Sequence, residues 1–363
     1  EAYTLLLVLP YEVIMKKNDN LKELLKKRRE LQEFTEKFYD YWRKIERYGI
    51  IQKKLRSLAA ENDALIEATE KFTYIILKLY RSISQNINGK PNQVYRQLPA
   101  GLNAGLIISS NKWQMPKGYD ALRNIDFIDT VLIRTPFMGY SKSNTRSGVF
   151  QEVKRNPIPF HELNPRHWFC YPVKVGPLLA YVYFHRDFIH LGVALSNLFE
   201  AALEEEYVGK KPDLIYIFGT KSEEYDCTFY QDTKNDIYVG CASRVDKNDY
   251  FGYMKKMLLT LHNVYMINHG KLPIHGAMVN ILLKSGKQKN IVIIGDSGAG
   301  KSESLEGLRV IGGAHLKEMR IIFDDMGTFI KENDKVVAIG TEIGAFIRLD
   351  DLENGYAYRE IDR

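Results

Sequence analysis

The chain has 363 residues, a formal net charge of +6, and 45% apolar and 12% aromatic residues. This length allows two or three domains, and the apolar content is enough for sizeable cores, which excludes a disordered chain. Cys170, Cys227 and Cys241 form no C-x-x-C pair, which argues against a disulfide framework and a zinc site and fits a cytoplasmic protein.

The first segment, residues 1–13 (EAYTLLLVLPYEV), has a short apolar centre, and we expect it to form a buried strand. It lacks the basic region and the small-residue cleavage site of a signal peptide. No apolar run approaches the roughly 18 residues that a membrane helix needs, so no membrane partner is expected. The chain starts with Glu and stops at GYAYREIDR without an obvious finishing element, which suggests a fragment of a longer protein.

Residues 21–85 carry a helical pattern, in which apolar residues recur mostly at three- and four-residue steps with charged residues between them. Gly49 interrupts the pattern, so we expect a long helical hairpin within a mainly helical segment, residues 1–90. The hairpin is typical of a coiled-coil partner site, which would allow a homo-oligomer, or of a helical layer packed on its own domain. The second interpretation is favoured.

A turn-rich stretch at residues 86–93 precedes a mixed region, residues 91–235. Its strand-like runs are AGLIISS, DTVLIRT, PLLAYVYF and DLIYIFG, and GVALSNLFEAALEEE is helix-like. These runs predict a mixed α/β domain, which we assign to the substrate side. The strand-like DIYVGCAS then leads into a third segment, residues 236–363.

The third segment contains G-x-x-x-x-G-K-S, preceded by NIVIIG, which predicts a buried parallel strand, and followed by a helix-like run. The glycines let the backbone N–H groups face phosphate oxygens, and the helix N-terminus adds a positive dipole end. Lys301 would neutralise charge on the outer phosphates, and the Ser302 hydroxyl would ligate Mg²⁺. The predicted phosphate-binding residues are Gly295, Asp296, Ser297, Gly298, Ala299, Gly300, Lys301 and Ser302.

Downstream, MRIIFDDMG is a second apolar run that ends in Asp324 and Asp325. A carboxylate at a strand end beside a phosphate loop is where Mg²⁺ needs a ligand. The alternative is a turn after a strand, where Asp is favoured for its backbone preferences. The phosphate loop upstream favours metal binding.

Residues 249–276 carry a more specific pattern. Tyr250, Gly252, Lys255 and Lys256 occur in close succession, and His275 follows Lys256 by 19 residues. With the later phosphate loop and Asp pair, this order resembles the phosphoenolpyruvate carboxykinase family over roughly a third of the chain. The resemblance implies an α/β fold in which a carboxykinase-like P-loop domain follows a mixed α/β domain and an N-terminal helical hairpin.

The resemblance also implies roles for individual residues. The family's metal ligands fall on Lys256, His275 and one of Asp324 or Asp325. A lysine can ligate a metal only when neutral, which requires burial and nearby positive charge, such as that of Lys255, to depress its pKa.

Further residues match positions around the substrate in that family. Tyr250 and Lys255 match residues near the carboxylate substrate and the leaving CO₂, and TEIGAFIRLDDL weakly matches a family segment that would place Glu342. A dicarboxylate needs cationic contacts, and a polar loop offers three candidates, Arg134, Lys142 and Arg146.

The implied reaction interconverts oxaloacetate and phosphoenolpyruvate plus CO₂, with ATP, GTP or pyrophosphate as phosphoryl donor and Mn²⁺ and/or Mg²⁺ as cofactor. Departures from the family pattern in the loop make its large pyrophosphate-using branch a candidate. No nucleic-acid partner is expected, because the basic residues lack interleaved aromatic residues and a recognised motif.

Two alternatives remain open. IHGAMVNI and GDSGAGKSES are similar to HPr kinase/phosphorylase, a relative with the same phosphate-loop fold, and Tyr253 stands where the carboxykinase motif has Glu. In a protein kinase/phosphorylase of that type, Asp325 would be the general base on a serine, and Lys255 and Lys256 would have no metal role. A non-catalytic subunit that binds nucleotide is the third interpretation.

Overall fold

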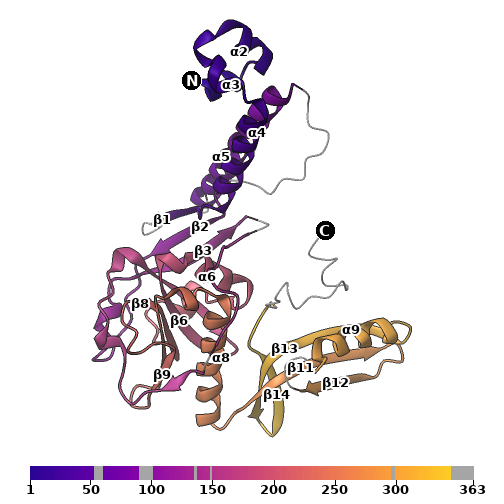
Figure 1. Ribbon diagram of the computed structural model, residues 1–363. Helices are drawn as coiled ribbons and strands as arrows, with labels where there is room; N and C mark the ends of the chain where they lie inside the picture. The colour runs from indigo at the N-terminus through magenta and orange to yellow at the C-terminus, as the bar shows by residue number, and fades with distance from the viewer. Residues whose placement is uncertain (53–59, 90–100, 135–136, 148, 296–298, 345–363) are drawn as a thin grey trace. The chain divides into compact units, whose positions relative to one another are not determined.

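The computed structural model describes residues 1–52, 60–89, 101–134, 137–147, 149–295 and 299–344. They form two compact units: Glu1–Ser109 with Thr130–Tyr140, and Ser110–Asp129 with Ser141–Arg363. Helices, a mixed sheet and a second, antiparallel sheet make the protein an α/β protein (Figure 1). The expected division at residues 90 and 235 stays a prediction.

Short helices, rather than the expected buried strand, form the start of the first unit. Ala2 and Leu6 are buried one helical turn apart, whereas Val8 is exposed, so the apolar residues follow a helical period. Pro10 then begins the next helix at its N-cap. The helices are α1 (Ala2–Leu6), α2 (Tyr11–Lys17), η1 (Asp19–Leu21) and α3 (Lys22–Leu25).

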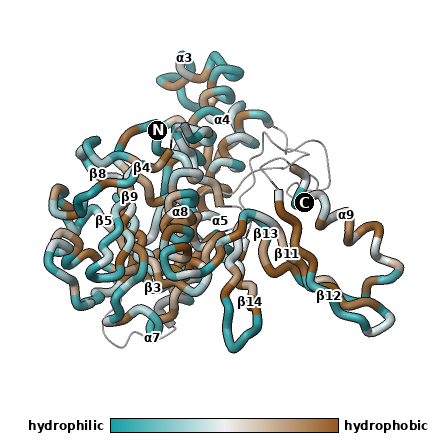
Figure 2. The backbone as a smooth tube through the Cα atoms, turned by 90° about the horizontal axis from the view of Figure 1, so that it is seen from below, coloured by the Kyte–Doolittle hydropathy of each residue, from teal (hydrophilic) through white to brown (hydrophobic). Residues whose placement is uncertain are grey.

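Two long helices, α4 (Arg28–Lys44) and α5 (Ala60–Asn88), form the expected hairpin. Tyr39 and Tyr80 stack with ring centroids 4.0 Å apart, and the Tyr80 hydroxyl donates to Glu36. Hydrophilic and hydrophobic residues alternate along α4 (Figure 2). The helical pattern does not continue directly after Gly49, because β1 (Tyr48–Gln52) pairs in parallel with β2 (Ala104–Ser109).

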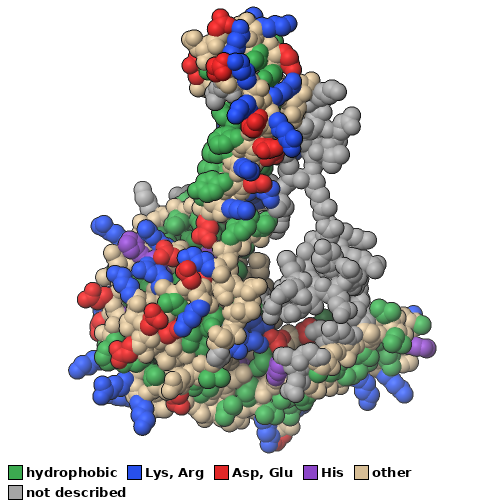
Figure 3. All heavy atoms as spheres, in the orientation of Figure 1, with side chains coloured by type: hydrophobic (Ala, Val, Ile, Leu, Met, Phe, Trp, Pro, Cys, Tyr) green, Lys and Arg blue, Asp and Glu red, His purple; other side chains and the backbone are tan. Residues whose placement is uncertain are grey.

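The exposed aromatic residues of α4 bear on oligomerisation, which stays a prediction. Phe34, Phe38 and Tyr41 lie one turn apart and are exposed, and hydrophobic side chains line this helix pair (Figure 3). If a second copy covers them, Phe34→Ser with Phe38→Ser should lower the mass measured by light scattering to that of a monomer. A monomeric unmodified protein, or an unchanged assembly in the variant, would contradict this.

The second unit is built on a sheet with strand order β3-β5-β6-β8-β10-β9-β4, and β7 pairs with β5. Strands β6, β8 and β10 are parallel to one another, so their carboxyl ends share one edge. The strands are β3 (Asp126–Ile133), β4 (Gln151–Glu152), β5 (Trp168–Val175), β6 (Leu178–His185), β7 (Glu200–Ala201), β8 (Leu214–Thr220), β9 (Thr228–Asp232) and β10 (Ile237–Ser243).

Helical segments connect these strands. The helix-like run GVALSNLFEAALEEE is not one helix, because it passes through α6, η6, β7 and α7 in turn. The α-helices are α6 (Ile189–Ala194), α7 (Glu204–Tyr207) and α8 (Phe251–Asn268). The 3₁₀ helices are η2 (Asp120–Leu122), η3 (Ile158–Phe160), η4 (Pro165–His167), η5 (Arg186–Phe188), η6 (Leu195–Asn197) and η7 (Asp246–Asn248).

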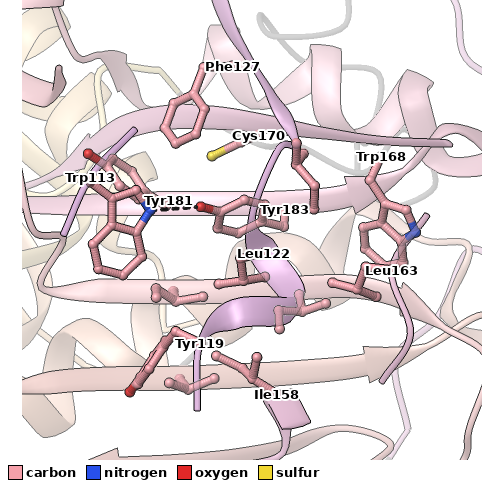
Figure 4. Close-up of a cluster of buried hydrophobic side chains, with 14 of the residues drawn as sticks. Trp113, Tyr119, Leu122, Phe127, Ile158, Leu163, Trp168, Cys170, Tyr181 and Tyr183 are labelled. Atoms are coloured by element: carbon pink, nitrogen blue, oxygen red, sulfur yellow. Dashed lines mark hydrogen bonds between the residues drawn. The ribbon is translucent and has the colours of Figure 1, made fainter. Parts of the chain in front are cut away.

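Both faces of this sheet are covered. One face carries the main core, which includes Ile215 and Ile217 of β8 and an aromatic group in which the Trp113 indole lies 3.3 Å from the Tyr183 hydroxyl (Figure 4). The other face packs against α8: the Tyr216 hydroxyl donates to a carbonyl of α8. Alternate residues of β8 therefore point to a core and to a helix, as a doubly covered strand requires.

The antiparallel sheet has strand order β12-β11-β13-β14. Its elements are β11 (Leu272–Leu283), β12 (Gln288–Ile294), α9 (Lys301–Gly312), β13 (Leu316–Glu332) and β14 (Lys335–Gly340). Helix α9 covers one face through Leu305, which is buried with Ala277 and Val279. Figure 2 shows hydrophobic residues along β11 and hydrophilic ones at the hairpin turns.

The expectation of a buried parallel strand before the phosphate loop is wrong. Strand β12 is antiparallel to β11 and lies at the sheet edge. Ile291 and Ile293 pack toward α9, but Ile294 is exposed on the opposite face. An apolar run does not show by itself whether both faces of a strand are covered.

In the part of the chain that the structure describes, no helix is both long and apolar enough to span a membrane.

Candidate functional site

The phosphate loop connects β12 to α9. Gly300 has a φ of 81°, a conformation that glycine adopts without strain, and α9 begins at Lys301. Lys301 is buried, and its ammonium donates to the carbonyl of Gly295 (2.9 Å), which directly follows β12. Three predicted phosphate ligands, Asp296, Ser297 and Gly298, and the side chain of Ser302 lie outside the described residues.

Sheet register brings this loop close to the predicted metal ligands. Gly276 in β11 is directly opposite Ile294 in β12 on one side and Asp325 in β13 on the other. Because neighbouring strands are ~4.8 Å apart, the start of the loop lies about 10 Å from Asp325 across the sheet.

The Asp325 carboxylate is the centre of a charged cluster. Lys255 donates to Asp325 Oδ2 (2.7 Å), and Lys256 Nζ lies 3.5 Å from the same oxygen. His275 Nε2 lies 3.0 Å from Asp325 Oδ1. Three elements, α8, β11 and β13, thus bring together Lys256, His275 and Asp325, and Asp325 rather than Asp324 makes these contacts.

The backbone of Asp325 has an unusual conformation. We expected the Asp pair at a strand end, but both residues lie within β13, because their pairing with β11 continues past them to Phe329. Asp325 has a φ of 102°, a region that residues with a side chain rarely occupy and that costs on the order of 1–3 kcal/mol. Such a conformation breaks the regular alternation of side chains along the strand.

Glu342, which the weak sequence match placed near the substrate, is a further member of the charged cluster. It lies 2.8 Å from the Lys255 ammonium, and its side chain is only 4% exposed. The neighbouring Thr341 hydroxyl donates to the Met326 carbonyl (3.0 Å), which holds this segment against β13. Burial raises the pKa of Glu342, and Lys255 opposes that change.

The remaining charges of the cluster stabilise one another. Burial disfavours the charged form of Lys255, but Glu342 and Asp325 outweigh burial and raise its pKa. Burial also disfavours charge on Asp325, but Lys255, Lys256 and His275 outweigh it and lower the pKa of Asp325 to about 2. Lys255 is therefore a fixed cation that bridges two carboxylates, and His275 is a nitrogen donor available for a metal ion. The Lys256 side chain is 40% exposed, so the burial expected of a neutral, metal-binding lysine is absent.

The lowered pKa of Asp325 predicts a pH dependence of stability. Its ordinary value is 3.8, so its stabilising effect is fully present above about pH 4 and is lost as the pH falls toward 2. The difference in urea midpoint between the unmodified protein and Asp325→Asn should therefore shrink across this window. A difference that stays constant down to pH 2 would contradict the prediction.

Asp325, His275 and Lys256 are spaced closely enough to share a divalent cation if the Lys256 amine is neutral in the bound state. Neighbouring ligands of an ion bound at ~2.1 Å are about 3 Å apart, close to the 3.0 and 3.5 Å that separate Asp325 from His275 and Lys256. Two nitrogen donors favour a transition-metal ion such as Mn²⁺ over Mg²⁺. No group of three His, Cys, Asp or Glu side chains is arranged to hold a metal among the described residues, and here an amine would be the third donor.

The Tyr-x-Gly part of the motif has a packing explanation. Tyr250 is the N-cap residue of α8. A Cβ on Gly252 would lie 2.3 Å from the Tyr250 ring, so the ring packs on the backbone at a position where only glycine fits. This contact orients Tyr250 one turn before Lys255.

One predicted substrate loop lies against the start of α8. The Tyr253 hydroxyl bonds to Ser147 next to Arg146, and the Lys142 backbone donates to Asp249. The sequence did not identify Asp249, which is buried with His190 at 2.8 Å; its place directly before Tyr250 was the available signal.

Arg146 and Arg134 are not brought together in one unit. Arg146 lies over the Phe150 ring in the unit that holds the cluster. Arg134 belongs to the other compact unit, where burial lowers its pKa and Glu70 opposes the change. A shared role in binding a dicarboxylate stays a prediction.

No protein-family model matches this chain, and a search of curated proteins finds no similar sequence.

Proposed function

We propose that the protein is a phosphoenolpyruvate carboxykinase-type lyase, which converts oxaloacetate into phosphoenolpyruvate and CO₂. The supporting observation is the convergence of Lys256, His275 and Asp325 beside a phosphate loop. These residues come from three separate segments, and a structural ion pair alone would not need two lysines and a histidine around one carboxylate.

In the proposed first half-reaction, the bond between C3 of oxaloacetate and its distal carboxylate breaks, and CO₂ leaves. A divalent cation held by Lys256, His275 and Asp325 would supply a Lewis acid for the substrate carbonyl. Lys255, a buried cation, stabilises the negative charge that develops nearby, and Tyr250 and Arg146 orient the carboxylates.

In the second half-reaction, the enolate oxygen attacks the transferred phosphoryl group, and the bond from phosphorus to the donor's leaving oxygen breaks. Residues Gly295 to Ser302 hold the donor, and Lys301 neutralises charge on its phosphates. The donor would be ATP, GTP or pyrophosphate. The loop sequence departs from the pattern of the ATP-using enzymes, so pyrophosphate is one of the candidate donors. The free thiols of Cys170, Cys227 and Cys241 fit a cytoplasmic site for this reaction.

A coupled assay tests this function directly. Phosphoenolpyruvate formation from oxaloacetate is measured with Mn²⁺ and, in parallel, with ATP, GTP and pyrophosphate. We expect turnover with one donor only. No activity with any of the three would contradict the lyase. Saturable donor binding without turnover would favour the non-catalytic nucleotide-binding subunit.

A protein kinase/phosphorylase of the HPr-kinase type is the second candidate, in which Asp325, two strands away from the start of the predicted phosphate loop, would be the general base on a serine. Lys256→Ala separates the two functions. In a lyase the variant should lose about a thousandfold in kcat/KM for oxaloacetate, since a ligand of the catalytic ion is gone. In a protein kinase it should keep most of its serine phosphorylation.

Lys271→Ala is the matched control, because this lysine follows the C-terminal end of the same helix. It should retain full activity in either case. Retained lyase turnover in Lys256→Ala would remove Lys256 from the proposed metal site.

A further inference from the structure

A cavity of about 1010 Å³ lies in the unit that holds the charged cluster. Three of its lining residues mark the carboxyl ends of parallel strands: His185 ends β6, Gly219 lies near the end of β8, and Arg244 follows β10. Ligands of open α/β sheets bind in crevices at this edge, because the strand ends and their loops leave space there. A volume of this size fits an organic molecule rather than a bare ion.

The cavity is distinct from the proposed catalytic site. His185 is on the sheet face that carries the aromatic core, since its strand partner Trp168 belongs to that core. Helix α8, with Lys255 and Lys256, packs on the opposite face, where a Cβ on Gly240 would touch Met257. The sheet itself separates the two regions.

Gly219, His185 and Arg244 pack closely together where they line the cavity. Gly219 has a φ of 104°, and a Cβ there would lie 2.8 Å from the Cβ of His185. Arg244 Nη1 lies 3.0 Å from His185 Nε2 and 3.3 Å from Asp187 Oδ2, so the guanidinium is held in place by an imidazole and a carboxylate. Such a preorganised guanidinium is suited to planar oxyanions.

The lining has a small excess of positive charge, with four arginine or lysine side chains against three carboxylates. Arg123 is paired with Asp120 and Arg244 with Asp187, whereas Lys221 and Arg186 have no carboxylate partner among the described residues. Among the described residues, Glu162 is the third carboxylate of the lining.

The pKa of His185 is lowered to about 4, chiefly by burial and also by Arg244, His167 and Arg186, against the opposing effect of Asp187. A neutral His185 imidazole adds no charge to the lining, so its positive charge comes from the arginine and lysine side chains.

We propose that this cavity binds a small organic anion, a dicarboxylate or a phosphate ester, through Arg244, Arg186 and Lys221. Its oxyanion groups accept hydrogen bonds from the guanidinium groups and the ammonium, and the aromatic faces of Trp168 and Phe160 line the cavity around its carbon skeleton.

Trp168 provides the readout, because its indole lines the cavity with its centroid 5.5 Å from the His185 ring. Succinate and glycerol 3-phosphate are titrated separately into the full chain, and tryptophan fluorescence is followed. We expect a saturable change with at least one of them, and the probe that binds identifies the anion class. Trp168→Phe should abolish the change while calorimetry still detects binding.

The affinities of three variants for the probe show whether it binds in this cavity. Lys221→Ala and Arg244→Ala should each weaken binding about tenfold or more, because each removes a charge-assisted contact. Lys301→Ala should leave the affinity unchanged, since the phosphate loop is elsewhere. Lys221→Ala carries little risk to folding, as Lys221 is exposed.

Three results would overturn the proposal. The first is that neither probe changes the fluorescence at millimolar concentration. The second is that both cavity variants bind as tightly as the unmodified protein. The third is that Lys301→Ala abolishes binding, which would assign the probe to the phosphate loop.

Discussion

Asp325→Asn should lower kcat/KM for phosphoenolpyruvate formation by about a thousandfold. The carboxylate faces Lys255, Lys256 and His275, and its neutral amide replacement would remove both the anionic metal ligand and the charge that balances these groups. A metal ion contributes several kcal/mol to the stabilisation of developing charge, and ~4 kcal/mol corresponds to about a thousandfold in rate. Steady-state assays over a range of Mn²⁺ concentrations measure the loss.

Asp334→Asn is the matched control, since Asp334 is an exposed carboxylate at the turn between β13 and β14 and also has a positive φ. It should keep full activity. The folded fraction of both variants must be followed by circular dichroism, because Asp325→Asn leaves buried Lys255 with Glu342 as its carboxylate partner. Folded Asp325→Asn with near-normal turnover would exclude Asp325 as a metal ligand.

Lys301→Ala should lower kcat for phosphoryl transfer by about a hundred- to a thousandfold. The ammonium now bonds the Gly295 carbonyl, a contact that a bound phosphate oxygen would replace. One preorganised donor directed at developing charge is worth about this factor in rate. Because Lys301 acts in phosphoryl transfer, decarboxylation of oxaloacetate to pyruvate should survive in the variant, and an assay of both products separates the two half-reactions.

Lys287→Ala offers the comparison for this variant, because Lys287 is exposed on the β11–β12 turn of the same sheet. It should be active. Equal loss of pyruvate and phosphoenolpyruvate formation in Lys301→Ala would contradict a role confined to the phosphoryl group.

Parts of the fold followed from local sequence patterns. The helical hairpin of α4 and α5 and the strand-like runs of β6, β8 and β10 have a clear period or a β-branched and aromatic composition. The expectation of a strand at residues 1–13 is wrong, because a short apolar run is compatible with both a strand and a helix. Packing of Leu6 with Ile14 and Leu25 between short helices decided the outcome.

In the candidate site, too, the sequence predicted some features and the tertiary structure decided others. Lys256, His275 and the Asp pair could be selected from their order along the chain, but the sequence offered no reason to prefer Asp325 over Asp324. That choice depends on the backbone of Asp325, which has a φ of 102° inside β13, and no local sequence pattern predicts this conformation.

The glycine-rich turn between a strand and a helix was predicted from the sequence alone, because it is a local pattern. The structure has Gly300 at a φ of 81° and α9 beginning at Lys301, and phosphate binding stays a prediction. The partners of Lys255 and the cavity at the ends of β6, β8 and β10 were decided only by tertiary structure. Lys255 and Asp325 are 70 residues apart, and their contact depends on how β13 aligns with β11 and on where α8 packs. Register and packing are collective properties of many weak contacts, so no single stretch of sequence encodes them.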